Sequence, residues 1–182
     1  NYELTKYLLT YGVNVTLIAD QVAPELIEKG AHWIPVHPSS LERTTALTKV
    51  WGFVQRADRI LQRISDRFDA VIGCGVTLNV PHTLNAVHFA HGGWRRSPYH
   101  VIKTRPGFSS AYQWVFSLFN DYWERQTLSK AKCIVAVSEM VKDELIASGI
   151  SERKIEVIVN GVDLNEFHPG PADRQEIGRA HV

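Results

Sequence analysis

The chain has 182 residues, 45% of them hydrophobic, so it can bury a sizeable core, and its length suits one α/β domain better than two. Its 20 Lys and Arg residues nearly balance 19 Asp and Glu residues, which excludes the overall basic field typical of duplex nucleic-acid binding. Its 2 cysteines form no CxxC motif and indicate neither a disulfide framework nor a zinc site, and no apolar stretch approaches the roughly 20 residues that span a bilayer.

The first part of the chain alternates helical and extended patterns. Apolar positions at helical spacing predict a helix over Tyr2–Tyr11 that ends at Gly12. Val13–Ala19 and Ala31–Val36 are short apolar runs that predict strands, and Ala23–Lys29 between them predicts a short helix.

A long helix and two buried strands are expected next. Thr44–Arg67 repeats apolar residues at helical spacing, which predicts an amphipathic helix. Ala70–Gly73 and Ala86–Phe89 are too short for independent helices and are typical of buried parallel strands. Phe108–Leu128 predicts a further helix, and the spacing of its large aromatic side chains favours a stripe that faces the core for most of them.

The remaining pattern predicts a strand over Lys132–Val137, a helix over Glu139–Ala147 and a final strand over Ile155–Val159. Strands that alternate with helices in this way predict an α/β fold, a Rossmann-like parallel sheet with helices on both faces. Ligands of such sheets bind at the carboxyl ends of the strands, so the loops at those ends are the places to look for a site.

His88 and His91 follow a predicted buried strand, and Gly92 and Gly93 after them would let the backbone approach a ligand closely. A histidine at this place can hydrogen-bond a sugar hydroxyl, but a packed structural histidine explains either residue equally well. Zinc has little support because no Cys or carboxylate follows at ligand spacing. The strand end is a candidate site, and no metal is expected in it.

Aromatic and basic residues alternate between Trp94 and Phe108, with Arg95 and Arg96 next to Trp94. This composition is typical of contacts with anionic lipid headgroups, phosphorylated acceptors or single-stranded nucleic acid. A solvated loop explains the same composition.

Two later strand ends carry further candidates. The hydroxyl of Ser138 can cap the helix that follows it, or the helix N-terminus can act as a weak anion site. Asn160 and Gly161 form a turn after the last strand, Asp163 follows, and Pro169–Pro171 predicts a domain boundary.

The segment Val157–Gly170 (VIVNGVDLNEFHPG) resembles the end of the N-terminal domain in retaining glycosyltransferases of family 4. Ala131–Ile158, Asn85–Gly93 (NAVHFAHGG) and Glu3–Asp20 (ELTKYLLTYGVNVTLIAD) support the resemblance, which covers essentially the whole chain apart from its tail. It implies the first of the two domains of a GT-B enzyme.

The resemblance implies that this domain binds the acceptor and that a second domain holds most of the nucleotide-sugar donor. It implies hexosyl transfer with retention, with no cofactor and no essential metal. The residue near the transferred sugar would be His91, with His88 as the alternative. The other residues of the acceptor and cleft segments would be Gly92, Gly93, Trp94, Arg95, Ser138, Asn160, Gly161 and Asp163.

Residues 1–169 are therefore expected to form the N-terminal domain, without a first strand and glycine-rich loop that would precede Asn1. Residues 170–175 would begin the interdomain linker, and residues 176–182 match the translation of a common sequencing adaptor, so they are expected to be an artefact. The donor-binding domain would follow, and the fragment alone is expected to be inactive.

The implied partners are a nucleotide sugar and a glycan, lipid-linked or cell-surface polysaccharide acceptor. No nucleic-acid partner is expected. We expect a cytoplasmic protein of polysaccharide biosynthesis, with possible peripheral contact with the inner face of an anionic membrane. Two alternatives remain open, a sugar-nucleotide epimerase of the same architecture and a non-catalytic sugar-binding module.

Overall fold

Parallel strands organise the structure. In a computed structural model of the chain, residues 2–40, 42–162 and 164 are described. One sheet pairs β1 (Thr16–Ala19) with β2 (His32–Pro35). The second has the spatial order β3-β4-β5-β6 and consists of β3 (Ile72–Cys74), β4 (His82–Val87), β5 (Ala131–Ala136) and β6 (Ile155–Val157). Every strand pairing is parallel.

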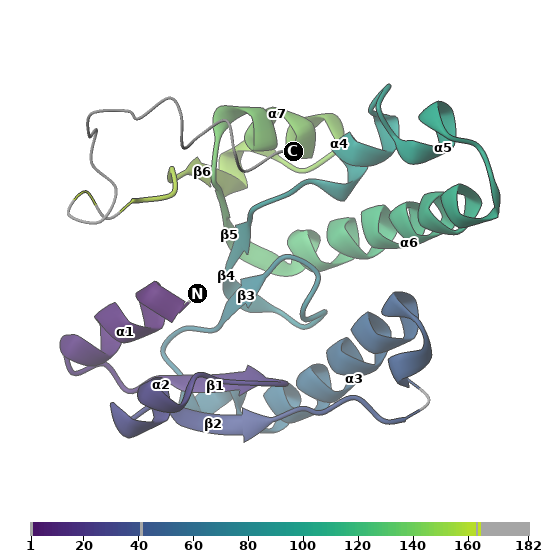
Figure 1. The fold of residues 1–182 in the computed structure, drawn as a ribbon. Coiled ribbons are helices and arrows are strands. Elements are labelled where there is room, and N and C mark those ends of the chain that lie inside the picture. The colour runs from purple at the N-terminus through teal and green to yellow at the C-terminus, as the bar shows by residue number, and fades with distance from the viewer. Residues whose placement is uncertain (1, 41, 163, 165–182) are drawn as a thin grey trace, which may run out of the picture.

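Helices connect the strands and flank the sheets, which confirms the predicted α/β class (Figure 1). Figure 1 shows α1 on the opposite side of the strands from α3 and α6. The α-helices are α1 (Tyr2–Thr10), α2 (Pro24–Glu28), α3 (Ala46–Ile64), α4 (His91–Arg96), α5 (Val101–Thr104), α6 (Phe108–Lys130) and α7 (Glu139–Ala147). Short 3-10 turns are η1 (Glu42–Thr44), η2 (Ser65–Arg67) and η3 (Glu152–Lys154).

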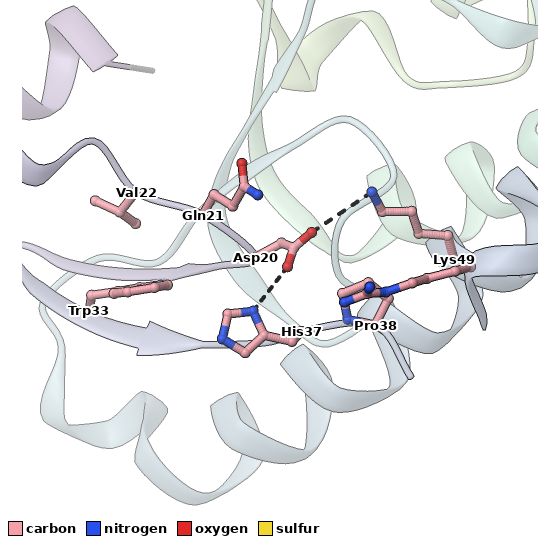
Figure 2. Close-up of a pocket in the computed structure, with 8 residues that line it drawn as sticks. Asp20, Gln21, Val22, Trp33, His37, Pro38 and Lys49 are labelled. Atoms are coloured by element: carbon pink, nitrogen blue, oxygen red, sulfur yellow. Dashed lines mark hydrogen bonds and ion pairs between the residues drawn. The ribbon is translucent and has the colours of Figure 1, made fainter. Parts of the chain in front are cut away.

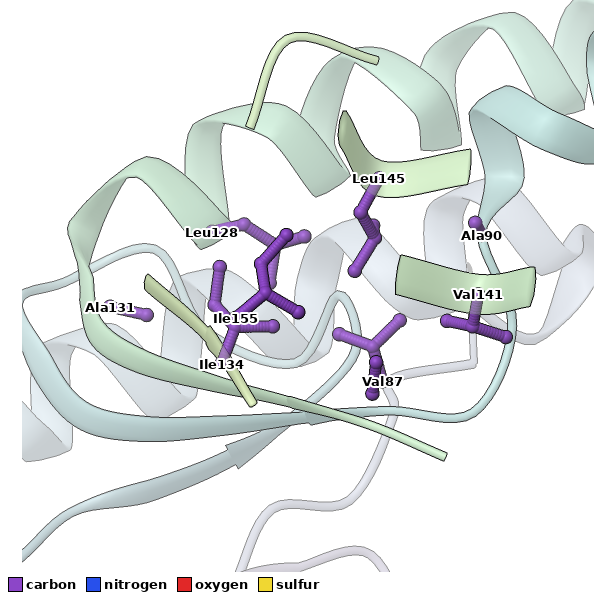
Figure 3. Packing of buried hydrophobic residues seen from close by; sticks show 9 residues of the cluster. Val87, Ala90, Leu128, Ala131, Ile134, Val141, Leu145 and Ile155 are labelled. Atoms are coloured by element: carbon purple, nitrogen blue, oxygen red, sulfur yellow. The ribbon is translucent and has the colours of Figure 1, made fainter. Parts of the chain in front are cut away.

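The main core lies between the second sheet and the helices α6 and α7. Leu128 of α6 and Leu145 of α7 are fully buried and point toward Val87, Ile134 and Ile155 of the strands (Figure 3). Burying side chains of this size stabilises a fold by about 1.5–3 kcal/mol each. This packing explains why the short apolar runs of the sequence form strands under two helices.

The two sheets are joined by side chains rather than by a strand ladder between β1 and β3 among the described residues. Ile18 of β1 packs against a small cluster that contains Leu61 of α3 together with Leu78 and Val80, and Val71 packs against the same cluster. The sequence predicts one sheet, whereas the structure has two that meet through this side-chain cluster. The expected strand before Asn1 lies outside the sequence and stays a prediction.

Strand β4 begins four residues earlier than the predicted strand Ala86–Phe89 and ends at Val87. The first half of β4 is not evident from the sequence because it contains the polar residues His82 and Asn85, yet both are buried. Their side-chain nitrogens have partners inside the protein, since His82 Nδ1 lies 2.8 Å from the Val80 carbonyl oxygen and Asn85 Nδ2 donates to the Gly75 carbonyl oxygen, whereas Asn85 Oδ1 is buried without a partner among the described residues. Buried polar side chains that find partners in this way do not destabilise a strand.

Helix α6 is turned opposite to the prediction, because most of its large apolar residues face solvent. The α6 outer face consists of the exposed residues Phe108, Tyr112, Val115, Phe119 and Tyr122. The buried face carries Ser117, Asn120, Asp121, Glu124 and Thr127. Four of these polar side chains, those of Ser117, Asp121, Glu124 and Thr127, bind backbone or side-chain groups of neighbouring segments, and this pairing favours the polar face as the buried one.

Candidate functional site

The carboxyl edge of the second sheet gathers several of the predicted site residues. The parallel register pairs Val87 of β4 with Ala136 of β5, so His88 and Ser138 both lie just beyond neighbouring strand ends. Ala136 pairs in turn with β6, after which Asn160 follows. The topology therefore brings these positions to one edge of one sheet, where parallel α/β sheets bind their ligands.

His91 begins helix α4, while His88 is exposed before it. The imidazole of His91 is partly buried and meets the ring of Phe89 edge-on, with 5.2 Å between the ring centroids. Burial lowers the pKa of His91, and the nearby Asp121 carboxylate offsets this only in part. The imidazole is therefore held in its neutral form, which can both donate and accept a hydrogen bond.

A buried carboxylate holds the start of helix α4. Glu124 of α6 has only 2% of its surface exposed and accepts hydrogen bonds from the backbone N–H of His91, at 3.0 Å, and from that of Gly92. Free N–H groups at a helix start need such an acceptor. Burial raises the pKa of Glu124 to about 7, against the effect of these N–H groups. The sequence patterns gave no sign of this contact, since a glutamate inside a helix is usually solvated.

The sequence predicts that Gly92 and Gly93 let the backbone approach a ligand, and this stays a prediction; the close neighbours of both glycines in the structure are side chains of the protein itself. A Cβ atom on Gly92 would overlap Ser148 and Asp121, and a Cβ atom on Gly93 would overlap the side chain of Glu144. Helix α4 can pack here only because both positions lack side chains.

The segment after Gly93 is not the solvated loop that the sequence allowed, since it folds into helices α4 and α5. Arg95 Nε donates to Asp121 at 2.8 Å, and Arg125 binds the same carboxylate. Burial would raise the pKa of Asp121, but the hydrogen bonds from Arg125 and Arg95 bring it below its ordinary value. Trp94 lies against the buried His100, with ring centroids 5.3 Å apart.

The later candidates have simpler surroundings. The hydroxyl of Ser138 accepts a hydrogen bond from the backbone N–H of Val141 at 3.2 Å, which confirms its capping role at α7. Asn160 and Gly161 are exposed after β6. Asp163 lies outside the described residues, as do residues 165–182 with the predicted linker and tail.

A pocket that the sequence-based search did not include lies at the carboxyl ends of β1 and β2 (Figure 2). It has a volume of about 530 Å³, and none of the predicted site residues lines it. Its lining includes Asp20, Gln21, Trp33, His37, Arg43 and Lys49. Asp20 and His37 follow these strands closely, so the strand-end rule would have found the pocket had it been applied to the first two strands.

No group of three or more His, Cys, Asp or Glu residues in the described ranges is placed to hold a metal ion. In the same part of the chain, no helix is long and apolar enough to cross a membrane.

Parallel strands that alternate with helices define a Rossmann-like domain. Residues 1–166 match the family model of Glycosyltransferase Family 4. The chain belongs to this family, and its function is of the glycosyltransferase type. A comparison with curated proteins found no match.

Replacement of Gly92 by alanine tests the packing of helix α4. Alanine would stabilise an uncrowded helical position by about 1 kcal/mol. Here we expect Gly92→Ala to lower the free energy of unfolding by about 1–3 kcal/mol, because Ser148 and Asp121 occupy the space. The control is Gly107→Ala, where no atom lies within 4 Å of the added Cβ, and it should cost less than about 1 kcal/mol. Urea denaturation measures both, and equal values would contradict the packing.

The raised pKa of Glu124 predicts a pH dependence of stability. Between its ordinary value of 4.5 and about 7, the unfolded chain loses the proton while the folded chain keeps it. Stability is therefore lost as pH rises through this range, by up to about 3 kcal/mol. We expect Glu124→Gln to gain stability relative to wild type over the same range, measured by urea denaturation at several pH values. The exposed Glu28→Gln is the control for removing a surface carboxylate. A constant difference between Glu124→Gln and wild type would contradict the prediction.

Proposed function

We propose that this chain is the acceptor-side domain of an enzyme that transfers a sugar, with retention, from a nucleotide-sugar donor to a glycan, lipid-linked or polysaccharide acceptor. Family membership over residues 1–166 supports the reaction class. The donor would be held mainly by a second domain encoded after residue 169. In this proposal the enzyme works on the cytoplasmic side of the membrane, without an essential metal.

The observation that carries the proposal is the set of contacts that hold His91 in place. Its backbone N–H is held by the buried Glu124, and its imidazole lies at the end of β4 beside Phe89. A neutral imidazole fixed in this way can bind a hydroxyl of the transferred sugar or of the acceptor. His88, exposed before it, is the alternative for the same role.

Charge on the leaving diphosphate would be stabilised by helix N-termini and basic side chains. In a cleft that excludes water, such preorganised groups would need no rearrangement as the charge develops. Helix α7 begins at the carboxyl end of β5, and Ser138 caps its first turn. Asn160, Gly161 and Asp163 would lie toward the interdomain cleft in the complete enzyme.

The second part of the proposal is a peripheral contact with an anionic membrane, which would bring the domain to a lipid-linked acceptor. The α6 outer face exposes large apolar side chains, and Phe108 at its start is 100% exposed. The two acidic residues of α6, Asp121 and Glu124, are both buried, while Lys103 and Arg105 just before the helix are exposed. An exposed apolar helix face with basic residues next to it is typical of interfacial binding. Since Arg95 is paired with Asp121, the proposed membrane contact depends on the other basic residues, Lys103 and Arg105.

Alanine substitution tests the role of the strand-end histidines. We expect His91→Ala in the complete enzyme to lower kcat by about 10- to 100-fold, because a hydrogen bond to the reacting sugars is lost. The matched control is His32→Ala, an exposed histidine at the start of β2, which should leave kcat unchanged. Sugar transfer from a panel of nucleotide sugars is the assay. An unchanged rate in the double variant His88→Ala, His91→Ala would remove both residues from the mechanism.

Vesicle co-sedimentation tests the membrane contact. We expect the chain to bind vesicles of phosphatidylcholine with phosphatidylglycerol, with binding that weakens as salt rises. Arg105→Glu should weaken it about fivefold or more, since each basic residue near the surface contributes about 1 kcal/mol. Tyr122→Ser should weaken it too, whereas Tyr7→Ser, an exposed tyrosine on α1, is the control. Vesicle binding that is insensitive to anionic lipid and to these substitutions would argue against membrane docking.

A further inference from the structure

The pocket at the ends of β1 and β2 has a lining that favours one kind of ligand, and it lies apart from the residues discussed for transfer. We propose that it binds a saccharide that carries an anionic group, a phosphate or a carboxylate. This inference rests on the proposed function, because such a saccharide would be the acceptor or part of it. The pocket volume of about 530 Å³ lies in the range typical of small-molecule sites.

Charge is the first argument. Asp20 lies between two partners, with its Oδ1 3.1 Å from His37 Nδ1 and its Oδ2 3.8 Å from Lys49 Nζ (Figure 2). Arg43 adds a second permanent cation to the lining. Two permanent cations against one carboxylate leave the pocket positive even when His37 is neutral, so an anionic group is attracted to it.

The weakness of these contacts is the second argument. The pair between Lys49 and Asp20 is long, and the side chain of Lys49 is 57% exposed. Lys49 can therefore turn toward an incoming phosphate at little cost, because an exposed ion pair contributes little stability. The guanidinium of Arg43 can bind two oxygen atoms of a phosphate or a carboxylate at once.

The aromatic wall is the third argument, and it favours a sugar over a bare anion. Trp33 is half-buried, and its indole Nε1 donates to the Ala19 carbonyl oxygen at 3.0 Å, which fixes the ring. His37 meets the same ring edge-on, with 6.0 Å between centroids. A fixed ring offers a flat apolar surface with a negative face to the C–H groups of a sugar. Asp20 and Gln21 beside it can bind the hydroxyl groups.

Binding to the 182-residue chain itself tests the assignment. The probes are glucose 6-phosphate and glucuronic acid, with glucose, inorganic phosphate and UDP as comparisons. Calorimetry gives Kd, and ¹⁵N NMR follows the indole N–H of Trp33. We expect both anionic sugars to shift the Trp33 signal, and Arg43→Ala to raise their Kd by about tenfold or more. The exposed Lys29→Ala, outside the pocket, should leave Kd unchanged.

Several results would overturn the assignment. Glucose that binds as tightly as glucose 6-phosphate would remove the anionic group from the proposal, and inorganic phosphate that binds as tightly would remove the sugar. UDP that binds as tightly would make the pocket a nucleotide site. A Kd that Arg43→Ala leaves unchanged, or shifts confined to the region of His91, would exclude this pocket. Because the readout is binding alone, it is independent of the transfer rate that tests the proposed function.

Discussion

The buried carboxylate of Glu124 is the contact on which the rest of the domain depends. It accepts the first N–H groups of α4, and it therefore fixes both the direction of α4 and the position of His91 at the end of β4. A carboxylate is costly to bury without such hydrogen-bond partners. The N–H groups offset this cost in part, and burial still raises the pKa of Glu124 to about 7.

The same constraint shapes the surface. With Glu124 and Asp121 inside, most of the large apolar residues of α6 lie outside the core and form its outer face, with Leu128 as the buried exception. Asp121 is compensated by Arg95 and Arg125, so two basic residues that look free in the sequence are occupied. The buried polar face and the exposed apolar face thus belong to one helix, α6.

The order of strands and helices follows from the sequence, because short apolar runs and capping residues such as Ser138 are local signals. The orientation of α6 does not follow from the sequence. The spacing identifies an apolar stripe, but it does not say on which face the polar side chains find hydrogen-bond partners in neighbouring segments. The start of β4 is hidden as well, since the nearby backbone oxygens of Val80 and Gly75 that pair with His82 and Asn85 are positioned only by the fold. The family is evident from the sequence, whereas the pocket beside Trp33 needs two strand ends to be brought together in space.

The junction between the two sheets has a mechanical consequence. The pocket at Asp20 belongs to the β1–β2 unit, and His91 belongs to the other sheet. Side chains such as Ile18 and Leu61, rather than a continuous backbone ladder among the described residues, set the spacing of the two units. A well-packed cluster resists compression, so its volume sets the distance between the pocket and the end of β4 near His91. If the pocket holds the acceptor as we propose, larger or smaller side chains at Ile18 and Leu61 would change the length of acceptor that reaches His91, without any change in either site.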